Sequence, residues 1–312
     1  MKALVIGYGS IGSRHTRILK GLGCPTAVLS RRKIDVRPSY RSLEEALAKE
    51  SPDYVVIATS TGEHFASLTG LKRAGYRGYV LVEKPLFASE ETFSCSGFRG
   101  VFVAYDLRFY PLLIQLRKAL QSEQVLSVQC YVGQYLPEWR PSTDYRKSYS
   151  ASKARGGGVL RDLSHELDYL TWIFGPWRRL AALGGHVSHL EIDSDDQYCV
   201  LLSTQRCPAV TVQLNYLDRT CRRELWVNTQ RHTFRVDLIH GIFQKDKEGP
   251  KQTSFDGDWT YRLEHEAVIK HGGRGLCTFD EGKQLVSMMS AIETAARKKT
   301  WKVNPRRGEV RR

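Results

Sequence analysis

The chain has 312 residues, of which 41% are hydrophobic and 26% charged, a composition typical of a globular protein long enough for two domains. No stretch approaches the roughly 18 consecutive apolar residues of a membrane span, which argues against membrane insertion. Seven cysteines occur without a C-x-x-C pair. This pattern indicates reduced thiols and no zinc site, so we predict no bound metal.

The formal charge of +14 raises the question of a nucleic-acid partner. A basic tail from residue 297 to 312 carries eight Lys or Arg and one Glu, and therefore half of this excess. Such a short tail is typical of a solvated chain end, so we expect no nucleic-acid partner. The remaining positive charge suits a small anionic ligand such as a phosphorylated cofactor.

A nucleotide-binding motif opens the chain. Residues 3–6 form an apolar run typical of a buried parallel strand, and a G-x-G-x-x-G pattern followed by helix-forming residues comes next. The glycines allow a tight turn and close approach of a pyrophosphate, which the helix N-terminus attracts. Because the strand starts at once, we expect no signal peptide and a cytoplasmic location. The cofactor-binding residues expected here are Gly7, Tyr8, Gly9, Ser10, Ile11 and Gly12.

The second predicted strand, residues 26–29, is followed by Ser30, Arg31 and Arg32. Enzymes that use NAD commonly place an acid about twenty residues past the glycines to bind the ribose hydroxyl. This chain has no acid there, and a hydroxyl with two guanidinium groups suits the 2′-phosphate of NADP. The sequence therefore favours NADP as cofactor, with NAD possible. The alternative is two exposed arginines on a loop.

Polar residues follow the next two predicted strands, 53–58 and 79–82. Ligands of open α/β sheets bind at the carboxyl ends of the strands, so these residues are expected to line the cofactor. They are Thr59, Ser60, Thr61 and His64 after the first strand, and Glu83 and Lys84 after the second.

The first domain is expected to end near residue 104, after a strand at 101–103. Leucines at 112, 116 and 120 indicate a helix, and residues 126–132 alternate like a strand. Residues 134–155, which include Arg140, are polar, aromatic and basic, and we interpret them as a loop over the active site. The expected substrate contacts are Arg108, Tyr145, Arg146 and Tyr169.

Three glycines at 156–158 lead into a predicted helix that ends at Gly175. Leucines at 163, 167 and 170 should face the core, whereas a polar side could face a cleft. Short alternating runs between 181 and 238 predict an antiparallel sheet, and residues 281–296 a last helix. The polar side of the helix carries Asp162, His165, Glu166 and Tyr169.

These motifs together resemble the glucose–fructose oxidoreductase, inositol dehydrogenase and MocA family. The resemblance implies an α/β fold with a Rossmann domain over 1–104 and, over 105–312, an α/β domain with a large, mostly antiparallel sheet. It further implies NAD(P)-dependent chemistry on a CH–OH group of a sugar, sugar derivative or nucleotide-sugar, and a homodimer or homotetramer formed through the exposed sheet face. The similar segments are 59–64, 83–85, 105–111, 156–175 and 190–195.

The resemblance also implies catalytic roles. Lys84 should lie at the nicotinamide end of the cofactor. The peptide bond between Lys84 and Pro85 is expected to be cis. His165 is our choice for general acid/base because imidazole titrates near neutral pH, and we expect it to act with Lys84 on one nicotinamide ring. Asp162 is a third candidate. Family members space this pair D-x-x-x-H, whereas this chain has D-x-x-H, which leaves the role of Asp162 open.

Two other interpretations remain at this point. One is a dinucleotide-binding regulator without catalysis, since the family includes a galactose-pathway transcriptional repressor; that hypothesis predicts loss of Lys84 or His165, and both are present. The other is a biliverdin- or imine-type reductase, which would need a flat apolar pocket. His186 and His189 form an H-x-x-H pair without a convincing third metal ligand.

Overall fold

The computed structural model describes residues 1–139, 141 and 143–305. The chain forms two compact units, which we call unit 1 (residues 1–109 and 256–286) and unit 2 (residues 110–255 and the chain from 287 onward). The sequence predicts that all residues after 104 belong to the second domain. The segment 256–286 instead packs in unit 1, because apolar side chains such as Val268 and Leu276 join the core of that unit.

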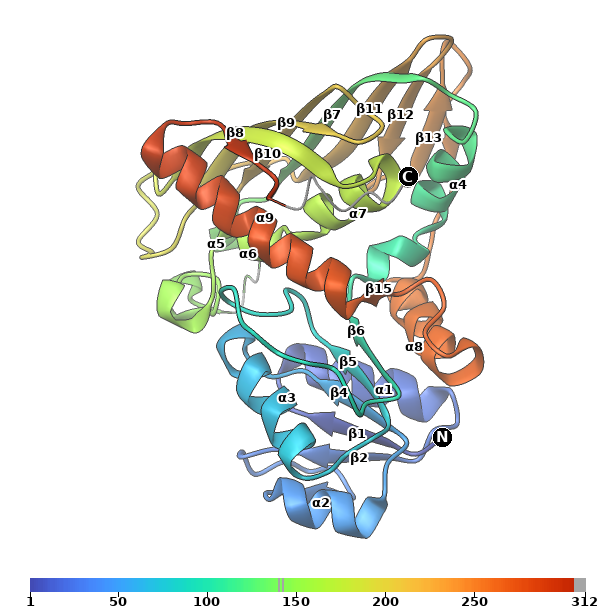
Figure 1. Ribbon diagram of the computed structural model, residues 1–312, viewed down its shortest axis with the longest axis vertical. Helices are drawn as coiled ribbons and strands as arrows, with labels where there is room; N and C mark the ends of the chain where they lie inside the picture. The colour runs from blue at the N-terminus through green and yellow to red at the C-terminus, as the bar shows by residue number, and fades with distance from the viewer. Residues whose placement is uncertain (140, 142, 306–312) are drawn as a thin grey trace. The chain divides into compact units, whose positions relative to one another are not determined.

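Unit 1 contains a seven-stranded sheet with the order β15-β6-β5-β4-β1-β2-β3 (Figure 1). Neighbouring strands are parallel except the pair β15–β6. Every residue of β1 and β4 is buried, as expected for strands covered on both faces. The strands are β1 (Ala3–Ile6), β2 (Thr26–Leu29), β3 (Ser39–Tyr40), β4 (Tyr54–Ile57), β5 (Tyr79–Val82), β6 (Gly100–Val103) and β15 (Cys277–Thr278).

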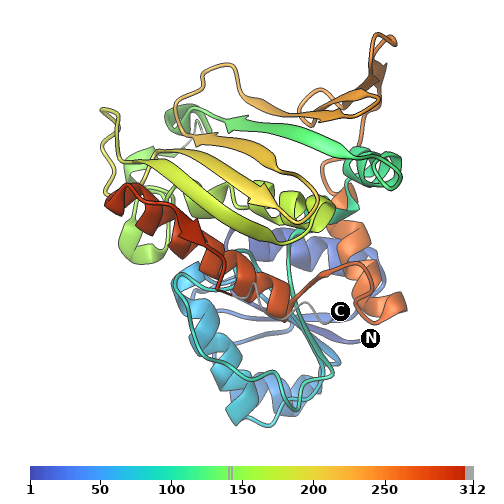
Figure 2. The same ribbon diagram turned by 45° about the horizontal axis from the view of Figure 1, so that its top comes forward.

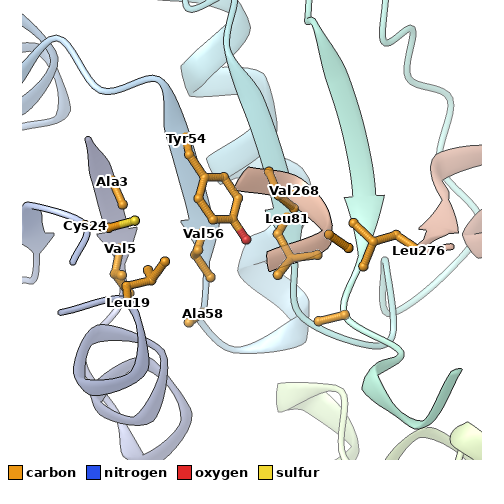
Figure 3. Close-up of a cluster of buried hydrophobic side chains, with 12 residues drawn as sticks. Ala3, Val5, Leu19, Cys24, Tyr54, Val56, Ala58, Leu81, Val268 and Leu276 are labelled. Carbon is orange, nitrogen blue, oxygen red and sulfur yellow. The ribbon is translucent and has the colours of Figure 1, made fainter. Parts of the chain in front are cut away.

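Helices α1 and α8 pack on one face of this sheet, where Leu19 of α1 and Val268 of α8 meet Val5 and Tyr54 of the strands (Figure 3). Leu19 and Val268 are fully buried, which contributes roughly 1.5–3 kcal/mol for each side chain. The helices of unit 1 are α1 (Ser10–Gly21), α2 (Leu43–Glu50), α3 (His64–Arg73) and α8 (Trp259–His271), with the 3₁₀ turns η1 (Thr61–Glu63) and η2 (Asp106–Phe109).

Unit 2 contains a nine-stranded sheet with the order β14-β13-β12-β11-β7-β10-β9-β8-β16. Within it only β7 and β10 pair in parallel among the described strands. The predicted fold class, a Rossmann domain plus an α/β domain with a mostly antiparallel sheet, is confirmed. The strands are β7 (Val125–Gly133), β8 (Trp177–Gly185), β9 (Gln197–Thr204), β10 (Ala209–Asn215), β11 (Arg222–Thr229), β12 (Thr233–Asp237), β13 (Ile242–Lys245), β14 (Lys251–Gln252) and β16 (Lys302–Val303).

Helix α7 lies against one face of this sheet (Figure 2), where Leu167, Leu170 and Phe174 are fully buried. No helix in the described part of the chain is long and apolar enough to cross a bilayer. The helical segments of unit 2 are α4 (Pro111–Ala119), α5 (Leu136–Trp139), η3 (Tyr145–Lys147), η4 (Lys153–Arg155), α6 (Val159–Asp162), α7 (His165–Phe174) and the part of α9 (Phe279–Lys298) after Val286.

The helix predicted after the three glycines is broken in two. The backbone leaves helical geometry at Leu163 (φ −98°, ψ 28°), so Asp162 ends α6, and α7 begins at His165 after Ser164. The expectation of a polar side facing a cleft was also wrong for Glu166, which is 0% exposed. Its carboxylate accepts hydrogen bonds of 2.7 and 3.0 Å from Arg223 of β11, because a buried charge needs a partner.

Candidate functional site

The glycine turn between β1 and α1 has the shape that a dinucleotide requires. Gly7 has φ +97°, and a Cβ there would lie 2.5 Å from the Ala58 carbonyl oxygen; a Cβ at Gly12 would lie 2.2 Å from the Gly7 oxygen. Gly9 faces open space, and α1 has neither a side-chain cap nor an acid in its first turn. The backbone N–H groups at this end are therefore available to a pyrophosphate. Tyr8, Ser10 and Ile11 lie at the same turn and are half-buried or exposed.

The residues after β2 contact an acid that the sequence analysis did not single out. Arg31, which is 84% exposed, forms an ion pair with Glu63 of η1, whose second oxygen accepts a 2.8 Å hydrogen bond from Ser60. Burial would raise the pKa of Glu63, but the hydrogen bonds from Ser60 and Arg31 lower it below its ordinary value. Ser30 is buried and accepts a 3.1 Å hydrogen bond from the Arg32 backbone. Any phosphate that Arg31 binds must therefore compete with Glu63.

The buried side chain of His64 contacts backbone carbonyl groups and does not face a ligand. Its ring is 1% exposed, with Nδ1 3.0 Å from the Pro85 carbonyl oxygen and Nε2 3.2 Å from that of Thr59. Burial lowers the pKa of His64. The expectation that this side chain lines the cofactor does not fit these contacts. The Thr59 hydroxyl oxygen, in contrast, is buried with no hydrogen-bond partner among the described residues, and Thr61 is buried beside it in η1.

The Glu83-Lys84-Pro85 segment follows β5 directly. The Glu83 carboxylate turns inward, with Oε1 2.8 Å from His15 Nε2, and its Oε2 accepts a 3.0 Å hydrogen bond from the Lys84 backbone. The bond between Lys84 and Pro85 is cis, as the resemblance implied. Lys84 is half-buried at the carboxyl end of the sheet, whereas Glu83 is 8% exposed. Glu83 therefore supports this turn, and Lys84 is the more exposed side chain of the two.

In unit 2, Asp162 accepts a 2.6 Å hydrogen bond from the hydroxyl of Tyr216, the residue that follows β10. Burial raises the pKa of Tyr216 well above its ordinary value, so Tyr216 remains a donor. Asp162 and His165 are both half-buried. Tyr216 could not be predicted as a site residue, because nothing in the sequence indicates that a tyrosine at the end of a strand contacts Asp162, 54 residues away.

The glycines at 157 and 158 set the start of α6. A Cβ at Gly157 would lie 2.2 Å from the Tyr149 carbonyl oxygen, and one at Gly158, where φ is +114°, would lie 2.5 Å from Asp195 Oδ1. Asp195 accepts a 3.0 Å hydrogen bond from the Leu160 backbone, and burial raises the pKa of its carboxyl. These close approaches fix α6, which then carries Asp162.

Two expected substrate contacts lie inside the protein. Tyr169 is 0% exposed, and its hydroxyl lies 3.1 Å from Glu166 Oε1 and 3.3 Å from Cys130 Sγ, so it packs between α7 and β7. Arg108 is 4% exposed and pairs with Glu281 at 3.1 Å. Both residues complete packing within their own units, which corrects their assignment to substrate binding.

The other two expected substrate contacts are accessible. Arg146 is 53% exposed and pairs with Asp144 at 2.9 Å and Glu191 at 3.1 Å. The Tyr145 hydroxyl accepts a 3.3 Å hydrogen bond from the Glu191 backbone. Arg140 of the same segment lies outside the described residues.

No group of three His, Cys, Asp or Glu within the described ranges could hold a metal ion. His186 of the H-x-x-H pair has its Nε2 3.0 Å from the Leu190 carbonyl oxygen.

The parallel sheet, the glycine turn and the polar strand ends define unit 1 as a dinucleotide-binding domain of the Rossmann type. Residues 1–94 match the model of an oxidoreductase family with an NAD-binding Rossmann fold, and residues 114–235 match the GFO/IDH/MocA C-terminal domain. The chain belongs to the GFO/IDH/MocA family of oxidoreductases.

An uncharacterized oxidoreductase of Synechocystis sp. is 32% identical over an alignment of 155 residues that covers 47% of this chain and 41% of that protein. The chain thus matches less than half the length of this curated relative. The WlbA dehydrogenase of Bordetella pertussis, solved with NADH and UDP-GlcNAcA, is 19% identical with a TM-score of 0.80 over 98% of both chains. Levoglucosan dehydrogenase, solved with NADH and levoglucosan, is 16% identical with a TM-score of 0.83 over 98% of this chain and 99% of that one. These two likenesses show the shared fold.

Proposed function

We propose that this protein is an NAD(P)-dependent dehydrogenase or reductase that transfers hydride between the nicotinamide and a CH–OH or carbonyl carbon of a sugar, sugar derivative or nucleotide-sugar. The observation that carries this proposal is the pairing, within unit 1, of an open phosphate-binding turn at Gly9 with a lysine at the carboxyl end of β5. Membership of the family supports it, and solved proteins of the same fold bind NADH together with UDP-GlcNAcA or levoglucosan.

In this proposal the bound cofactor supplies the hydride chemistry, while side chains of the chain orient the substrate and manage its proton. His165 exchanges the hydroxyl proton, and the Lys84 ammonium group donates to the reacting oxygen. Asp162, aligned by Tyr216, orients the substrate or the imidazole. Tyr145 and Arg146 are the accessible candidates for contacts to the rest of the sugar.

We further propose a preference for NADP over NAD. The absence of an acid after β2 and the presence of Arg31 and Arg32 support it, since guanidinium groups pair well with phosphate. The ion pair between Arg31 and Glu63 works against it. A titration of the protein with NADPH and NADH, followed by cofactor fluorescence, measures the balance directly.

A panel of sugars and nucleotide-sugars, assayed with NADH and NADPH by the absorbance of the reduced cofactor, tests the activity. We expect saturable turnover of at least one compound. If the protein binds the dinucleotide tightly and turns over no compound in the panel, the regulatory interpretation gains and the proposed activity fails.

We also propose that the protein forms a homodimer or homotetramer through the face of the nine-stranded sheet opposite α7. That face has a hollow of about 640 Å³. The hollow is lined by exposed apolar side chains, which are uncommon in such number on a monomer surface. They include Leu183 (69% exposed), Leu201 (53%), Trp226 (40%) and Trp301 (56%).

A cytoplasmic location stays a prediction. All seven cysteines are free thiols in the structure, which fits a reducing compartment.

A further inference from the structure

Four buried polar side chains form one hydrogen-bonded row through unit 1. The Tyr54 hydroxyl lies 3.0 Å from His265 Nδ1, His265 Nε2 lies 2.9 Å from His15 Nδ1, and His15 Nε2 lies 2.8 Å from Glu83 Oε1. The first three side chains are 0% exposed and Glu83 is 8% exposed. Tyr54 belongs to the apolar cluster shown in Figure 3. The row joins β4, α8, α1 and the end of β5, elements far apart in the sequence.

The two ends of the row decide which nitrogen carries each proton. A carboxylate only accepts, so His15 donates from Nε2 to Glu83. At the other end, the Tyr54 hydroxyl has no other hydrogen-bond partner within the described chain, so it donates to His265 Nδ1. His265 must then donate from Nε2 to His15 Nδ1. All three hydrogen bonds are satisfied with both imidazoles neutral and every donor directed toward Glu83.

The pKa shifts of Tyr54, His265 and Glu83 have the directions that this arrangement of protons requires. Burial raises the pKa of Tyr54 well above its ordinary value, so the hydroxyl keeps its proton. Burial lowers the pKa of His265 well below its ordinary value, so this ring is neutral. Burial would raise the pKa of Glu83, but the hydrogen bond from His15 and the charge of Lys84 lower it.

Other titratable groups also face the row. Tyr261 of α8 packs edge-on against His15 with the ring centres 5.7 Å apart, and the Arg14 guanidinium lies 4.4 Å from the centre of the Tyr261 ring. His64 and Lys84 interact electrostatically with Glu83. Of the described groups around Glu83, His15 is the one that donates a side-chain hydrogen bond to it.

We propose that His15 and His265 are positioning residues for Lys84. The row holds the Glu83 carboxylate ionised and in one orientation, and the second oxygen of Glu83 fixes the Lys84 backbone where the sheet ends. The inference rests on the proposed function, since it gives Lys84 a role at the substrate. It also explains why the segment 256–286 packs in unit 1, because helix α8 of this segment places His265 in the row.

The first test determines which nitrogen of each histidine in the row is protonated, and it needs no substrate. In protein labelled with ¹⁵N histidine, NMR at neutral pH should show both His15 and His265 protonated on Nε2 and not on Nδ1. The resonances are assigned with His15→Gln and His265→Gln. A doubly protonated His15, or a proton on Nδ1 of either ring, overturns the proposed direction of the row.

The second test measures whether the row affects the catalytic function of Lys84. His15→Leu removes the donor to Glu83 and should lower kcat about ten- to hundredfold with little change in cofactor affinity, because small misplacements of a reacting group have effects of this size. His15→Gln retains an N–H near the position of Nε2 and should restore most of the turnover. The matched control is His271→Gln, an exposed histidine at the end of the same helix, which should leave kcat unchanged.

The outcomes distinguish a failure of the positioning role of His15 from a failure of the proposed function. Normal kcat in His15→Leu, beside an inactive Lys84→Ala, overturns the positioning role and leaves the proposed function intact. Equal loss in His15→Leu and His15→Gln also overturns it, because the donor would then be irrelevant. Normal turnover in Lys84→Ala instead removes the catalytic role of Lys84, and the positioning role fails with it even if the NMR spectrum shows the expected row. The proposed function fails separately, when the wild-type protein turns over no sugar or nucleotide-sugar with either cofactor.

Discussion

The Tyr216 hydroxyl donates a 2.6 Å hydrogen bond to Asp162 Oδ2, and this bond joins the end of β10 to the end of α6. Tyr216 is fully buried, and Trp139 packs edge-on against its ring with the centres 5.8 Å apart. The altered spacing between Asp162 and His165 left the direction of the carboxylate open, and the tyrosine is what fixes it.

Tyr216→Phe and Asp162→Asn should therefore lower kcat by similar factors, and the double variant should lose little more. A hydrogen bond to a charged group contributes about 1.5–3 kcal/mol, so each single change should cost roughly ten- to hundredfold. Steady-state kinetics on a double-mutant cycle measures the coupling. Tyr110→Phe, which removes a 3.2 Å hydrogen bond to the Leu238 carbonyl oxygen in the same unit, is the control. Purely additive losses would show that the two side chains act independently.

Lys84→Ala and His165→Ala should each lower turnover by about a hundredfold or more, the usual effect of removing a positioned acid or base. The affinity for the dinucleotide should change much less than turnover in His165→Ala, since His165 lies outside unit 1, which holds the glycine turn. Lys49→Ala, an exposed lysine paired with Glu45 on α2, serves as the control. Wild-type kinetics in both variants on a verified substrate would defeat the catalytic assignment.

The buried strands were readable from the sequence because each is a continuous apolar run. Residues 26–29 and 79–82 were predicted as strands and form β2 and β5 with the same bounds. Helix α8 was missed, since its buried face carries Thr260, Glu264 and His265 and so lacks an apolar period. Of these buried polar residues, His265 belongs to the hydrogen-bonded row with α1 and β4, which only the tertiary structure brings together.

Less of the candidate site than of the fold could be predicted from the sequence. Motif spacing located the glycine turn and the segment around Lys84, since both follow predicted strands directly. It could not reveal that Glu63 pairs with Arg31, or that Tyr169 turns inward, because those contacts depend on which long-range partner a polar side chain meets. The break at Leu163 and Ser164 was equally hidden, because neither residue is a helix breaker by propensity.

Arg31→Ala should weaken NADPH binding about tenfold and leave NADH binding nearly unchanged, because a charge-assisted hydrogen bond to phosphate is lost. Glu63→Gln should do the reverse and strengthen NADPH binding, since it releases Arg31 from its ion pair. Fluorescence titrations with both cofactors measure the two effects, and Arg73→Ala on exposed α3 surface is the control. Equal weakening of both cofactors by Arg31→Ala would contradict the preference for NADP.

Stability should fall as the pH falls from about 7 to 5. The pKa of buried His265 is depressed, so the unfolded chain takes up a proton below about pH 6.5 that the folded protein does not. The linked loss is at most about 1.4 kcal/mol per pH unit for one proton. Glu83, whose pKa is also lowered, adds to the loss only below about pH 4.5, in the same direction. Urea unfolding at several pH values should show a smaller slope of the unfolding free energy against pH for His265→Gln than for wild type or His271→Gln. An unchanged slope would show that folding does not lower the pKa of His265.

If the proposed homo-oligomer forms through the open sheet face, Leu201→Asp or Trp226→Asp should give a monomer. Both side chains are exposed on the open face of the nine-stranded sheet, and a carboxylate placed there would lose its hydration on association. Light scattering coupled to size-exclusion chromatography should give at least twice the chain mass of 35.5 kDa for wild type and a single chain mass for the variants. Ile239→Asp changes an apolar residue of similar exposure (48%) that does not line the hollow, and it should stay oligomeric. A wild-type protein that elutes as a monomer at micromolar concentration would remove the open sheet face as a self-association surface.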